Sequence, residues 1–373
     1  MTKNILRGDI SFPVLVLRES ALRANIQAMA DWCRVNHFEI APHGKTTMCP
    51  QIFRRQIDAG GWGMTVATAV QAMICIDAGF HRVLIANQVI GTANIRALAA
   101  AMKQYDTVDI YCLVDSVDSV DHLAHGLADA ATVRPMNVLV EVGKSGWRTG
   151  ARSVEAVLAI RERLGKYPSQ LEFRGVEGFE GLAKTPAEAE QFLVVVAETA
   201  ERLLDQAPIR DPIFSAGGSS YLGPVSRIFR TLRKPWRRIL RSGCYVTHDH
   251  GIYRQQQTAA LAADPTLPRF TPALELWACV QSIPDPGVAI LTFGKRNCAY
   301  DISLPTPLDV PGGVITAVND QHAYLSFPET ASLRVGDMLR FGISHPCTAF
   351  DKWRSILLVD DEYNVVDVYQ TFF

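Results

Sequence analysis

Hydrophobic and polar residues follow two different periods along roughly the first 250 residues of the chain. Short runs of Val, Ile, Leu and aromatic residues alternate with longer stretches in which apolar residues recur every three or four positions, as at Leu22, Ile26 and Met29. The short runs are typical of buried strands, and the longer period is typical of amphipathic helices. From residue 39 onward the pattern predicts eight strands, at residues 39–41, 64–67, 82–86, 109–114, 137–142, 172–179, 212–215 and 238–240.

Helical stretches separate most of these strands. An earlier run at residues 14–17 predicts a short lead-in strand, and a run at residues 244–246 closes the series. Regular alternation of strands and helices predicts a parallel sheet. Eight such units over roughly 210 residues fit a (β/α)8 barrel, which typically needs ~250 residues. A doubly wound open sheet is the alternative, although the first strand is not followed by the G-x-G-x-x-G motif of dinucleotide-binding folds.

The pattern changes after about residue 250, where proline and glycine become frequent and helical periodicity fades. Short alternating runs predict strands at residues 274–280, 288–293, 314–318, 323–327, 338–341, 356–359 and 365–369. These strands indicate a second, all-β domain. We therefore predict a barrel at residues 14–250 and a β-domain made of residues 1–13 and 251–373.

Composition and charge argue against several classes of protein. The 373 residues include 37 Lys and Arg against 38 Asp and Glu, so a net charge of −1 leaves no strong positive field for nucleic acid. There is no signal-peptide pattern and no apolar run near the roughly 20 residues of a membrane helix, so we expect no membrane partner and a cytoplasmic location. The eight cysteines are scattered without a C-x-x-C pair, which argues against a zinc ribbon or a disulfide framework.

Residues able to carry chemistry follow the predicted strands. In a barrel, active sites form at the carboxyl ends of strands, and phosphate often binds in the loops after strands 7 and 8. Ser-Ala-Gly-Gly-Ser-Ser at residues 215–220 and Ser-Gly-Cys-Tyr at residues 242–245 occupy these places and indicate either a phosphate cradle or two tight turns. Lys45 follows strand 1. In a dry pocket its amine would suit a Schiff base to pyridoxal phosphate, and the alternative is a solvated loop lysine.

Two further candidates follow the fifth and sixth strands. Arg148 could reach a cofactor or pair with an acidic side chain such as Glu141. Glu180 could face the site or the solvent.

The predicted β-domain contains a candidate metal pair. His345 and Cys347 are two residues apart, so on an extended segment they would share a face and could bind one zinc ion. Chance occurrence of this short pattern is the alternative. His248 and His250 have the same spacing, and we interpret them as loop residues between the domains.

Taken in order, these motifs resemble a known family. They are Pro-His-Gly-Lys-Thr at 42–46, Trp-Arg-Thr-Gly at 147–150, Gly-Gly-Ser at 217–219, His322 after Asn-Asp-Gln, and His345-x-Cys347. Their order resembles the fold-type III pyridoxal-phosphate enzymes of the D-serine dehydratase and D-threonine aldolase group. The run at residues 347–353 is similar to bacterial D-serine or D-amino-acid deaminases.

The resemblance implies an alanine-racemase-like barrel with a β-domain, in a homodimer whose active site lies between the barrel of one subunit and the β-domain of the other. It implies that Lys45 is the Schiff-base lysine and catalytic base, and that His345 and Cys347 hold Zn²⁺ or another divalent metal. It implies these contacts to pyridoxal 5'-phosphate: Lys45, His43, Arg148, Gly218, Ser219, Gly243 and Cys244. Thr47 and Glu180 depart from the residues that many members carry.

The implied activity is zinc-assisted dehydration and deamination of a D-β-hydroxy amino acid, similar to D-serine, to a keto acid and ammonia. The alternatives are a D-threonine-type aldolase or a racemase on the same scaffold. Tyr253 and Tyr300 are candidate bases for a racemase. A pyridoxal-phosphate carrier without catalytic activity is a third alternative, and the β-domain with its metal pair argues against it.

Overall fold

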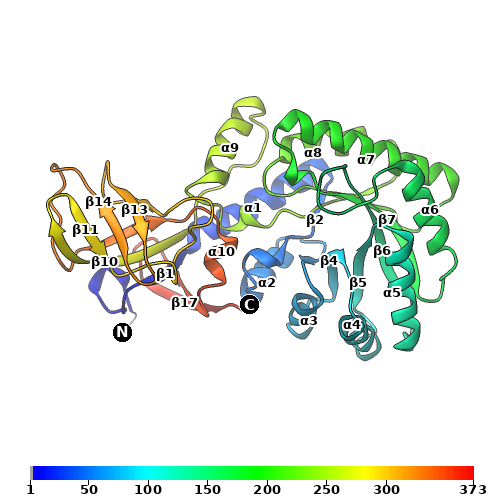
Figure 1. Cartoon of the computed structure of the whole chain (residues 1–373), viewed down its shortest axis with the longest axis horizontal. Coiled ribbons are helices and arrows are strands. Elements are labelled where there is room, and N and C mark those ends of the chain that lie inside the picture. The colour runs from blue at the N-terminus through cyan, green and yellow to red at the C-terminus, as the bar shows by residue number, and fades with distance from the viewer. Residues whose placement is uncertain (1–2) are drawn as a thin grey trace. The chain divides into compact units, whose positions relative to one another are not determined.

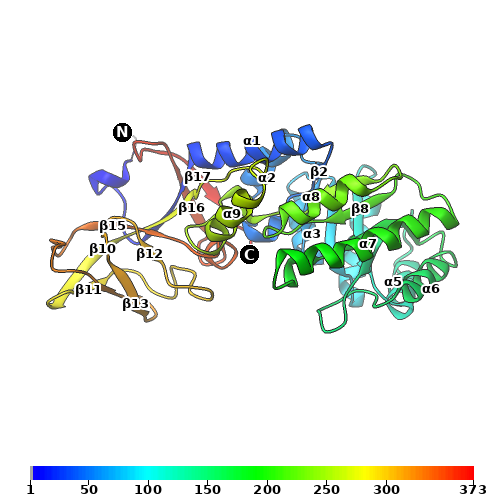
Figure 2. The same ribbon diagram turned by 90° about the horizontal axis from the view of Figure 1, so that it is seen from above.

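The computed structural model describes residues 3–373, which divide into two compact units. We call Ala30–Lys45 with Gln56–Gly243 the barrel unit. The sheet unit contains the chain up to Met29, Thr46–Arg55 and Cys244–Phe373. Figures 1 and 2 show the elements of both units from two directions. No helix within the described residues is long and apolar enough to cross a membrane.

The barrel unit is built on eight parallel strands in the order β2-β9-β8-β7-β6-β5-β4-β3. These are β2 (Glu39–Ile40), β3 (Met64–Val66), β4 (Arg82–Gln88), β5 (Asp109–Val114), β6 (Met136–Val142), β7 (Leu171–Gly178), β8 (Ile213–Ala216) and β9 (Arg237–Leu240). The two ends of this order also meet, because the Trp62 N–H donates to the Ile40 carbonyl at 2.7 Å and the Thr65 N–H to the Pro42 carbonyl at 2.9 Å. The sheet closes on itself, and the predicted (β/α)8 barrel is confirmed.

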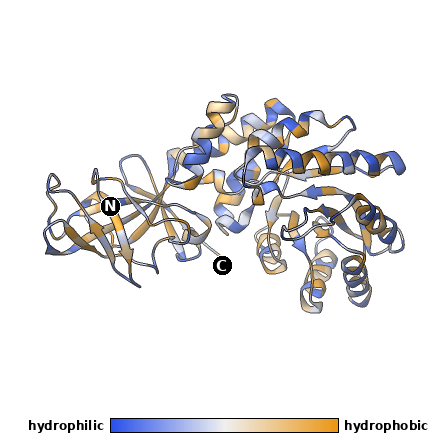
Figure 3. Ribbon diagram, turned by 45° about the horizontal axis from the view of Figure 1, so that its top comes forward, coloured by the Kyte–Doolittle hydropathy of each residue, from blue (hydrophilic) through white to orange (hydrophobic). Residues whose placement is uncertain are grey.

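Helices alternate with these strands. They are α1 (Glu19–Asn36), α2 (Pro50–Asp58), α3 (Ala69–Asp77), α4 (Thr92–Gln104), α5 (Val117–Asp129), α6 (Val154–Leu164), α7 (Pro186–Gln206) and α8 (Leu222–Thr231). Four of them begin after a Ser or Thr whose hydroxyl accepts a first-turn backbone N–H, namely Thr68, Ser116, Ser153 and Thr185. Such caps satisfy N–H groups that the helix leaves unpaired. Hydrophobic and hydrophilic residues alternate along the helices (Figure 3), as the sequence periodicity predicts.

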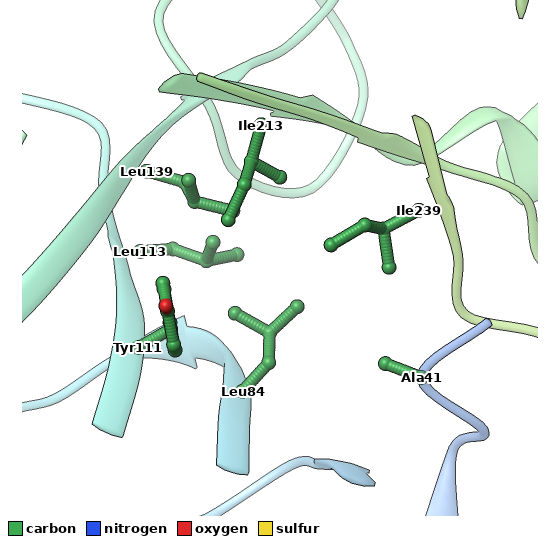
Figure 4. Close-up of a cluster of buried hydrophobic side chains, with 7 residues drawn as sticks. All are labelled: Ala41, Leu84, Tyr111, Leu113, Leu139, Ile213 and Ile239. Atoms are coloured by element: carbon green, nitrogen blue, oxygen red, sulfur yellow. The ribbon is translucent and has the colours of Figure 1, made fainter. Parts of the chain in front are cut away.

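The inside of the barrel is filled with apolar side chains. A cluster of buried residues comes from the strands and the residue after β2, and Figure 4 shows them pointing toward one another: Ala41, Leu84, Tyr111, Leu113, Leu139, Ile213 and Ile239. Close packing of this kind makes the barrel a solid core and not a pore. It holds the carboxyl ends of the strands in fixed positions.

The sheet unit contains a mostly antiparallel sheet of nine strands. They are β1 (Val14–Arg18), β10 (Leu274–Asp285), β11 (Val288–Leu291), β12 (Thr306–Pro307), β13 (Val314–Val318), β14 (Ala323–Ser326), β15 (Met338–Gly342), β16 (Ser355–Val359) and β17 (Val365–Gln370). The seven strands predicted after residue 250 are all present. β1 lies between β10 and β16, although the predicted boundary at residue 14 placed it with the barrel. Its side chains pair across the sheet, with Val14 opposite Trp277.

Three helical segments differ from what the sequence pattern predicts. The segment Cys244–Val246 is a 3-10 turn, η4, and the Cys244 carbonyl accepts the His248 N–H at 2.7 Å instead of joining a ladder. A helix, α9 (Ile252–Ala263), follows it within the predicted β-domain. One carboxylate oxygen of Asp249 accepts the N–H groups of Gly251, Tyr253 and Arg254, which caps this helix. The short helix α10 (Cys347–Phe350) begins at the predicted metal pair.

Candidate active site

The barrel unit has a cavity of about 60 Å³ at the carboxyl ends of its strands. Its lining residues lie in or directly after seven strands. They are His43, Lys45, Ala67, Ala86, Asn87, Glu141, Arg148, Glu177, Phe179, Gly217, Gly218 and Arg241. This is where enzymes with this barrel carry their active sites. The structure therefore brings together Lys45, His43, Arg148 and Gly218, which come from three separate motifs.

Lys45 and His43 reach the cavity from the loop after β2. Lys45 lines the cavity and is exposed, which agrees with the solvated alternative considered from the sequence. The backbones of His43 and Thr65 form an isolated parallel β-bridge. The buried Nδ1 atom of His43 has no hydrogen-bond partner among the described residues. Burial lowers the pKa of His43 well below its ordinary value, and the positive charges of Lys45 and Arg241 lower it further. The imidazole is therefore neutral at physiological pH and can contact a ligand.

A buried ion pair forms one wall of the cavity. The Arg241 guanidinium donates to Glu177 Oε2 at 2.5 Å and to the Gly178 carbonyl at 3.3 Å. The two side chains are 5% and 1% exposed. Burial raises the pKa of Glu177 to about 8; Arg241 lowers it, and the carboxylates of Glu141 and Glu180 raise it. Groups with strongly perturbed pKa values in a cavity are typical of functional sites.

Arg148 is exposed, and its guanidinium carbon lies 5.3 Å from the centre of the Phe179 ring. Glu141, the acidic partner considered from the sequence, accepts hydrogen bonds from Gln88 Nε2 at 2.5 Å and Thr149 Oγ1 at 2.7 Å. Arg148 is thus held over an aromatic face, and the Glu141 carboxylate is satisfied by other donors. This leaves the Arg148 guanidinium available to a ligand in the cavity.

The carboxyl group of Glu180 occupies the glycine loop after β8. One carboxylate oxygen of Glu180 accepts the Gly217 N–H at 3.1 Å, and the other accepts the Gly218 N–H at 2.8 Å. Glu180 is fully buried, so it faces the loop and not the solvent, and burial raises its pKa. Gly217 has a φ of 95°, and a Cβ there would lie 2.6 Å from Leu240 Cδ2, so the loop requires glycine at this position.

Three loops at the cavity are tied together by hydrogen bonds. Ser242 Oγ donates to the Gly218 carbonyl at 2.6 Å, and the His43 N–H donates to the Ser242 carbonyl at 3.3 Å. The buried Gly243 follows Ser242 directly. Ser219 is partly buried beside Gly218. The predicted phosphate-binding residues of the barrel unit therefore lie in two loops that contact each other.

The residues at this cavity fit pyridoxal phosphate. Lys45 offers a primary amine, Arg148 and Arg241 offer positive charge, and the Nδ1 atom of His43 is a buried polar atom that still needs a partner. The enclosed volume is smaller than that of an ordinary ligand pocket, and Lys45 and Arg148 in its lining are exposed. The Gly218 N–H donates to the Glu180 carboxyl group, so a phosphate group could accept it only in place of Glu180.

In the sheet unit, His345 is oriented by a carboxylate. His345 Nδ1 lies 2.5 Å from Asp301 Oδ2, and Thr348 Oγ1 donates to Asp301 Oδ1 at 2.7 Å. His345 also has a φ of 149°, which side-chain-bearing residues rarely adopt and which is typical of functional positions. A histidine that ligates a metal usually binds a carboxylate through its second ring nitrogen. The arrangement therefore suits metal binding through Nε2.

Cys347 lies in a cluster of sulfur and hydroxyl groups. Its Sγ is 3.4 Å from Cys244 Sγ and 3.3 Å from Thr46 Oγ1. Cys244 Sγ also lies 3.4 Å from the Tyr253 hydroxyl. The expectation of an extended segment at residues 345–347 is wrong, because Pro346 has a helical φ of −59° and Cys347 opens α10.

The donor chemistry of His345 and Cys347, a nitrogen and a thiol, suits zinc. Within residues 3–373, however, no group of three or more His, Cys, Asp and Glu side chains is arranged to hold a metal ion. His248 and His250 lie before α9, and burial lowers the pKa of each to about 4. The buried His248 Nε2 and His250 Nδ1 atoms have no hydrogen-bond partner in the described chain.

The remaining sequence candidates belong to the sheet unit. Thr47 is buried in the sheet unit. Burial raises the pKa of Tyr253, and the nearby Cys244 thiol raises it further. The Tyr300 ring is exposed, with Lys352 Nζ 5.5 Å from its centre. None of the three lines the cavity of the barrel unit.

Sequence reasoning missed three side chains at these sites: Glu177, Arg241 and Asp301. Glu177 and Arg241 could have been noticed because each is an ionisable residue at the end of an apolar strand. No sequence signal connects Asp301 with His345, since 44 positions separate them.

A family model described as a putative serine dehydratase domain matches residues 273–359. D-threonine aldolase from Arthrobacter sp. is 25% identical over 361 residues, which cover 94% of this chain and 90% of that protein.

Solved structures share the fold over nearly the whole chain. D-threonine aldolase from Filomicrobium marinum has a TM-score of 0.86 at 23% identity, covering 97% of this chain and 95% of that one. D-threo-3-hydroxyaspartate dehydratase, in a cysteine variant solved in the metal-free form, has a TM-score of 0.80 at 20% identity, with 99% of both chains covered. Alanine racemase from Clostridium difficile 630 has a TM-score of 0.69 at 12% identity, covering 98% of this chain and 100% of that one. The alanine-racemase-type fold is thus confirmed, and so is the resemblance to the fold-type III pyridoxal-phosphate enzymes of the D-serine dehydratase and D-threonine aldolase group.

Proposed function

We propose that this protein is a pyridoxal-phosphate-dependent lyase that converts a D-β-hydroxy amino acid to a keto acid and ammonia. The observation that carries the proposal is the cavity at the strand ends, where Lys45 lies with Arg148 and Arg241. The match to a serine dehydratase domain supports dehydration, because residues 273–359 contain both His345 and Cys347. A D-threonine-type aldolase is the second candidate, and the similarity to D-threonine aldolases favours it.

The side chains of the barrel unit supply distinct chemical functions. The Lys45 amine would hold the cofactor, and its Nζ would accept the substrate α-proton as a base. Arg148 and Arg241 place positive charge in the cavity, where anionic groups of cofactor and substrate bind. The neutral His43 offers a ring nitrogen without adding to this charge. Pyridoxal phosphate, when bound, supplies the electron sink for the α-carbon.

We propose His345 and Cys347 as the residues that hold zinc, with Asp301 orienting the imidazole. A zinc ion there would supply Lewis-acid assistance to departure of the substrate hydroxyl. The same ion could assist the aldolase reaction, so the ligands alone do not select the product. Thiolate ligands favour zinc over manganese or magnesium.

The decisive assay uses the protein together with pyridoxal phosphate. It is incubated with D-serine, D-threonine and D-threo-3-hydroxyaspartate in three separate reactions. Keto acid and ammonia should form. A chelator should abolish their formation, and added zinc should restore it. Glycine with an aldehyde would replace the proposal by the aldolase, and the opposite enantiomer as product would indicate a racemase. Cofactor binding without any turnover would refute the lyase.

The lysine assignment has an independent test in the absorbance of the bound cofactor. Lys45→Ala should remove both the visible band of covalently bound pyridoxal phosphate and the activity. Lys234→Ala is a matched control, because Lys234 pairs with Asp205 and is absent from the cavity lining. A visible band that survives in Lys45→Ala would show that another amine binds the cofactor.

We also propose that two copies of the chain form a homodimer in which the barrel of one subunit and the β-domain of the other complete each site. This follows from the family resemblance. Sedimentation should show a dimer, and activity should be lost when dilution separates the subunits. A monomer that keeps full activity would reject the shared site.

A further inference from the structure

The thiol cluster of the sheet unit contains two cysteines in direct contact. Cys244 Sγ and Cys347 Sγ are 3.4 Å apart, although 103 positions separate the residues in the chain. Each opens a short helical turn, Cys244 in η4 and Cys347 in α10. Other cysteine thiols contact different groups: Cys112 donates to the Met136 sulfur, and Cys298 to the Gly294 carbonyl.

We propose that Cys244 and Cys347 form a reversible disulfide under oxidation by hydrogen peroxide. A disulfide bond is about 2.0 Å long, so the sulfurs must approach by roughly 1.4 Å, which is within reach of side-chain rotation. Cys347 is partly exposed and Cys244 is buried, so the oxidant reaches Cys347 first. This inference concerns the thiols alone and does not depend on the proposed lyase activity.

The reaction balances with peroxide as the two-electron oxidant. Peroxide oxidises the Cys347 thiol to a sulfenic acid and leaves as water. The Cys244 thiol then attacks the Cys347 sulfur, the S–S bond forms, the S–O bond breaks, and a second water carries away the hydroxyl with the Cys244 proton. Two hydroxyls lie beside the reacting sulfurs. The Thr46 hydroxyl is 3.3 Å from Cys347 Sγ, and the Tyr253 hydroxyl is 3.4 Å from Cys244 Sγ.

The consequence is a modification site that competes with metal binding. A sulfur in a disulfide is not a thiolate, so a Cys347 that is cross-linked to Cys244 has lost its ability to ligate zinc. Reduction by a thiol restores both cysteines.

The test treats the metal-free full-length protein with stoichiometric hydrogen peroxide, blocks remaining thiols under denaturing conditions and maps the peptides by mass spectrometry. The chain should lose two hydrogens, and titratable thiols should fall from eight to six, the two lost being those of the cross-link. A peptide pair linking Cys244 to Cys347 should appear and vanish with dithiothreitol. Cys244→Ala should abolish it, whereas Cys279→Ala, a partly exposed cysteine of the same unit, should retain it.

Recovery of Cys347 as sulfinic acid with Cys244 still reduced would overturn the proposal, as would a cross-link to another cysteine. Zinc titration of the reduced and oxidised proteins separates this inference from the proposed function. At least a tenfold loss of zinc affinity on oxidation supports both. A Cys244–Cys347 cross-link with unchanged zinc affinity supports the disulfide and refutes the metal role of Cys347.

Discussion

Replacing Arg241 by Met should destabilise the barrel unit, and the loss should increase with pH. The Arg241 guanidinium donates to Glu177 and to the Gly178 carbonyl, and both side chains of the pair are at most 5% exposed. Removing one partner of a buried ion pair costs about 3–5 kcal/mol while the other remains charged. Methionine fills most of the vacated volume, so the cavity it leaves adds little to this cost.

The pH dependence comes from Glu177. Its folded-state pKa is about 8, against an ordinary value of 4.5, because burial raises it more than Arg241 lowers it. A raised folded-state pKa adds stability that is lost as the pH rises through that pKa. Without Arg241 the folded-state pKa rises above that of the wild type, so ionising Glu177 becomes more costly.

The two pH regimes give different expected losses. At about pH 6 Glu177 is protonated in both folded proteins, so the variant loses hydrogen bonds worth about 1–3 kcal/mol. Above the wild-type pKa of Glu177 the loss should grow by about 1.4 kcal/mol for each further unit of pH. It should level off near 3–5 kcal/mol, once Glu177 is ionised in both proteins.

Denaturant unfolding of the metal- and cofactor-free proteins at about pH 6 and about pH 9 measures this difference. Arg227→Met is the matched control. It breaks an ion pair with Glu190 whose partners are 47% and 36% exposed, so it should cost less than about 1 kcal/mol at either pH. Combining Arg241→Met with Glu177→Gln should remove the pH dependence. Equal losses for Arg241→Met at both pH values would refute the titration of Glu177.

Three other outcomes follow from single contacts. Asp301→Asn should weaken zinc binding by about 10–100-fold in a competition titration, because the amide orients the His345 imidazole less well. Unchanged zinc affinity would show that Asp301 does not support the metal site. Glu180→Gln should cost about 1–3 kcal/mol of unfolding free energy, because the side-chain amide cannot accept both glycine N–H groups in the same way. An unchanged free energy of unfolding would show that these two hydrogen bonds do not stabilise the fold. Phe229→Ala should cost about 3–5 kcal/mol, since its buried ring packs edge-on against Phe38 at 5.0 Å and Phe214 at 5.8 Å, and a loss below about 1 kcal/mol would mean that the core relaxes around it.

Most of the secondary structure was predictable because it depends on local periodicity. The strands Asp109–Val114 and Val314–Val318 begin and end where the sequence pattern places them. Two segments differ from the prediction because short local contacts override the hydrophobic pattern. Residues 244–246 are apolar enough for a strand but form a 3-10 turn. Helix α9, which Asp249 caps, lies in a region where helical periodicity fades.

The candidate site was predictable to a similar extent. Lys45, His43, Arg148 and Gly218 could be found because each belongs to a motif that follows a strand, and the closed barrel brings these loops to one cavity. Glu180 was recognised as a departure from the family, yet its two hydrogen bonds to the glycine loop depend on the folded chain.

The sequence by itself determined which segments become strands and helices, that the strands form a barrel followed by a β-domain, and which lysine and arginine lie at the strand ends. Periodicity and position after a strand are local properties, so they can be read along the chain. The tertiary structure alone decided which side chains pair: Arg241 with Glu177 across 64 positions, His345 with Asp301 across 44, and Cys347 with Cys244 across 103. These contacts depend on the tertiary fold of each unit, because only the folded arrangement brings such distant residues within hydrogen-bonding range.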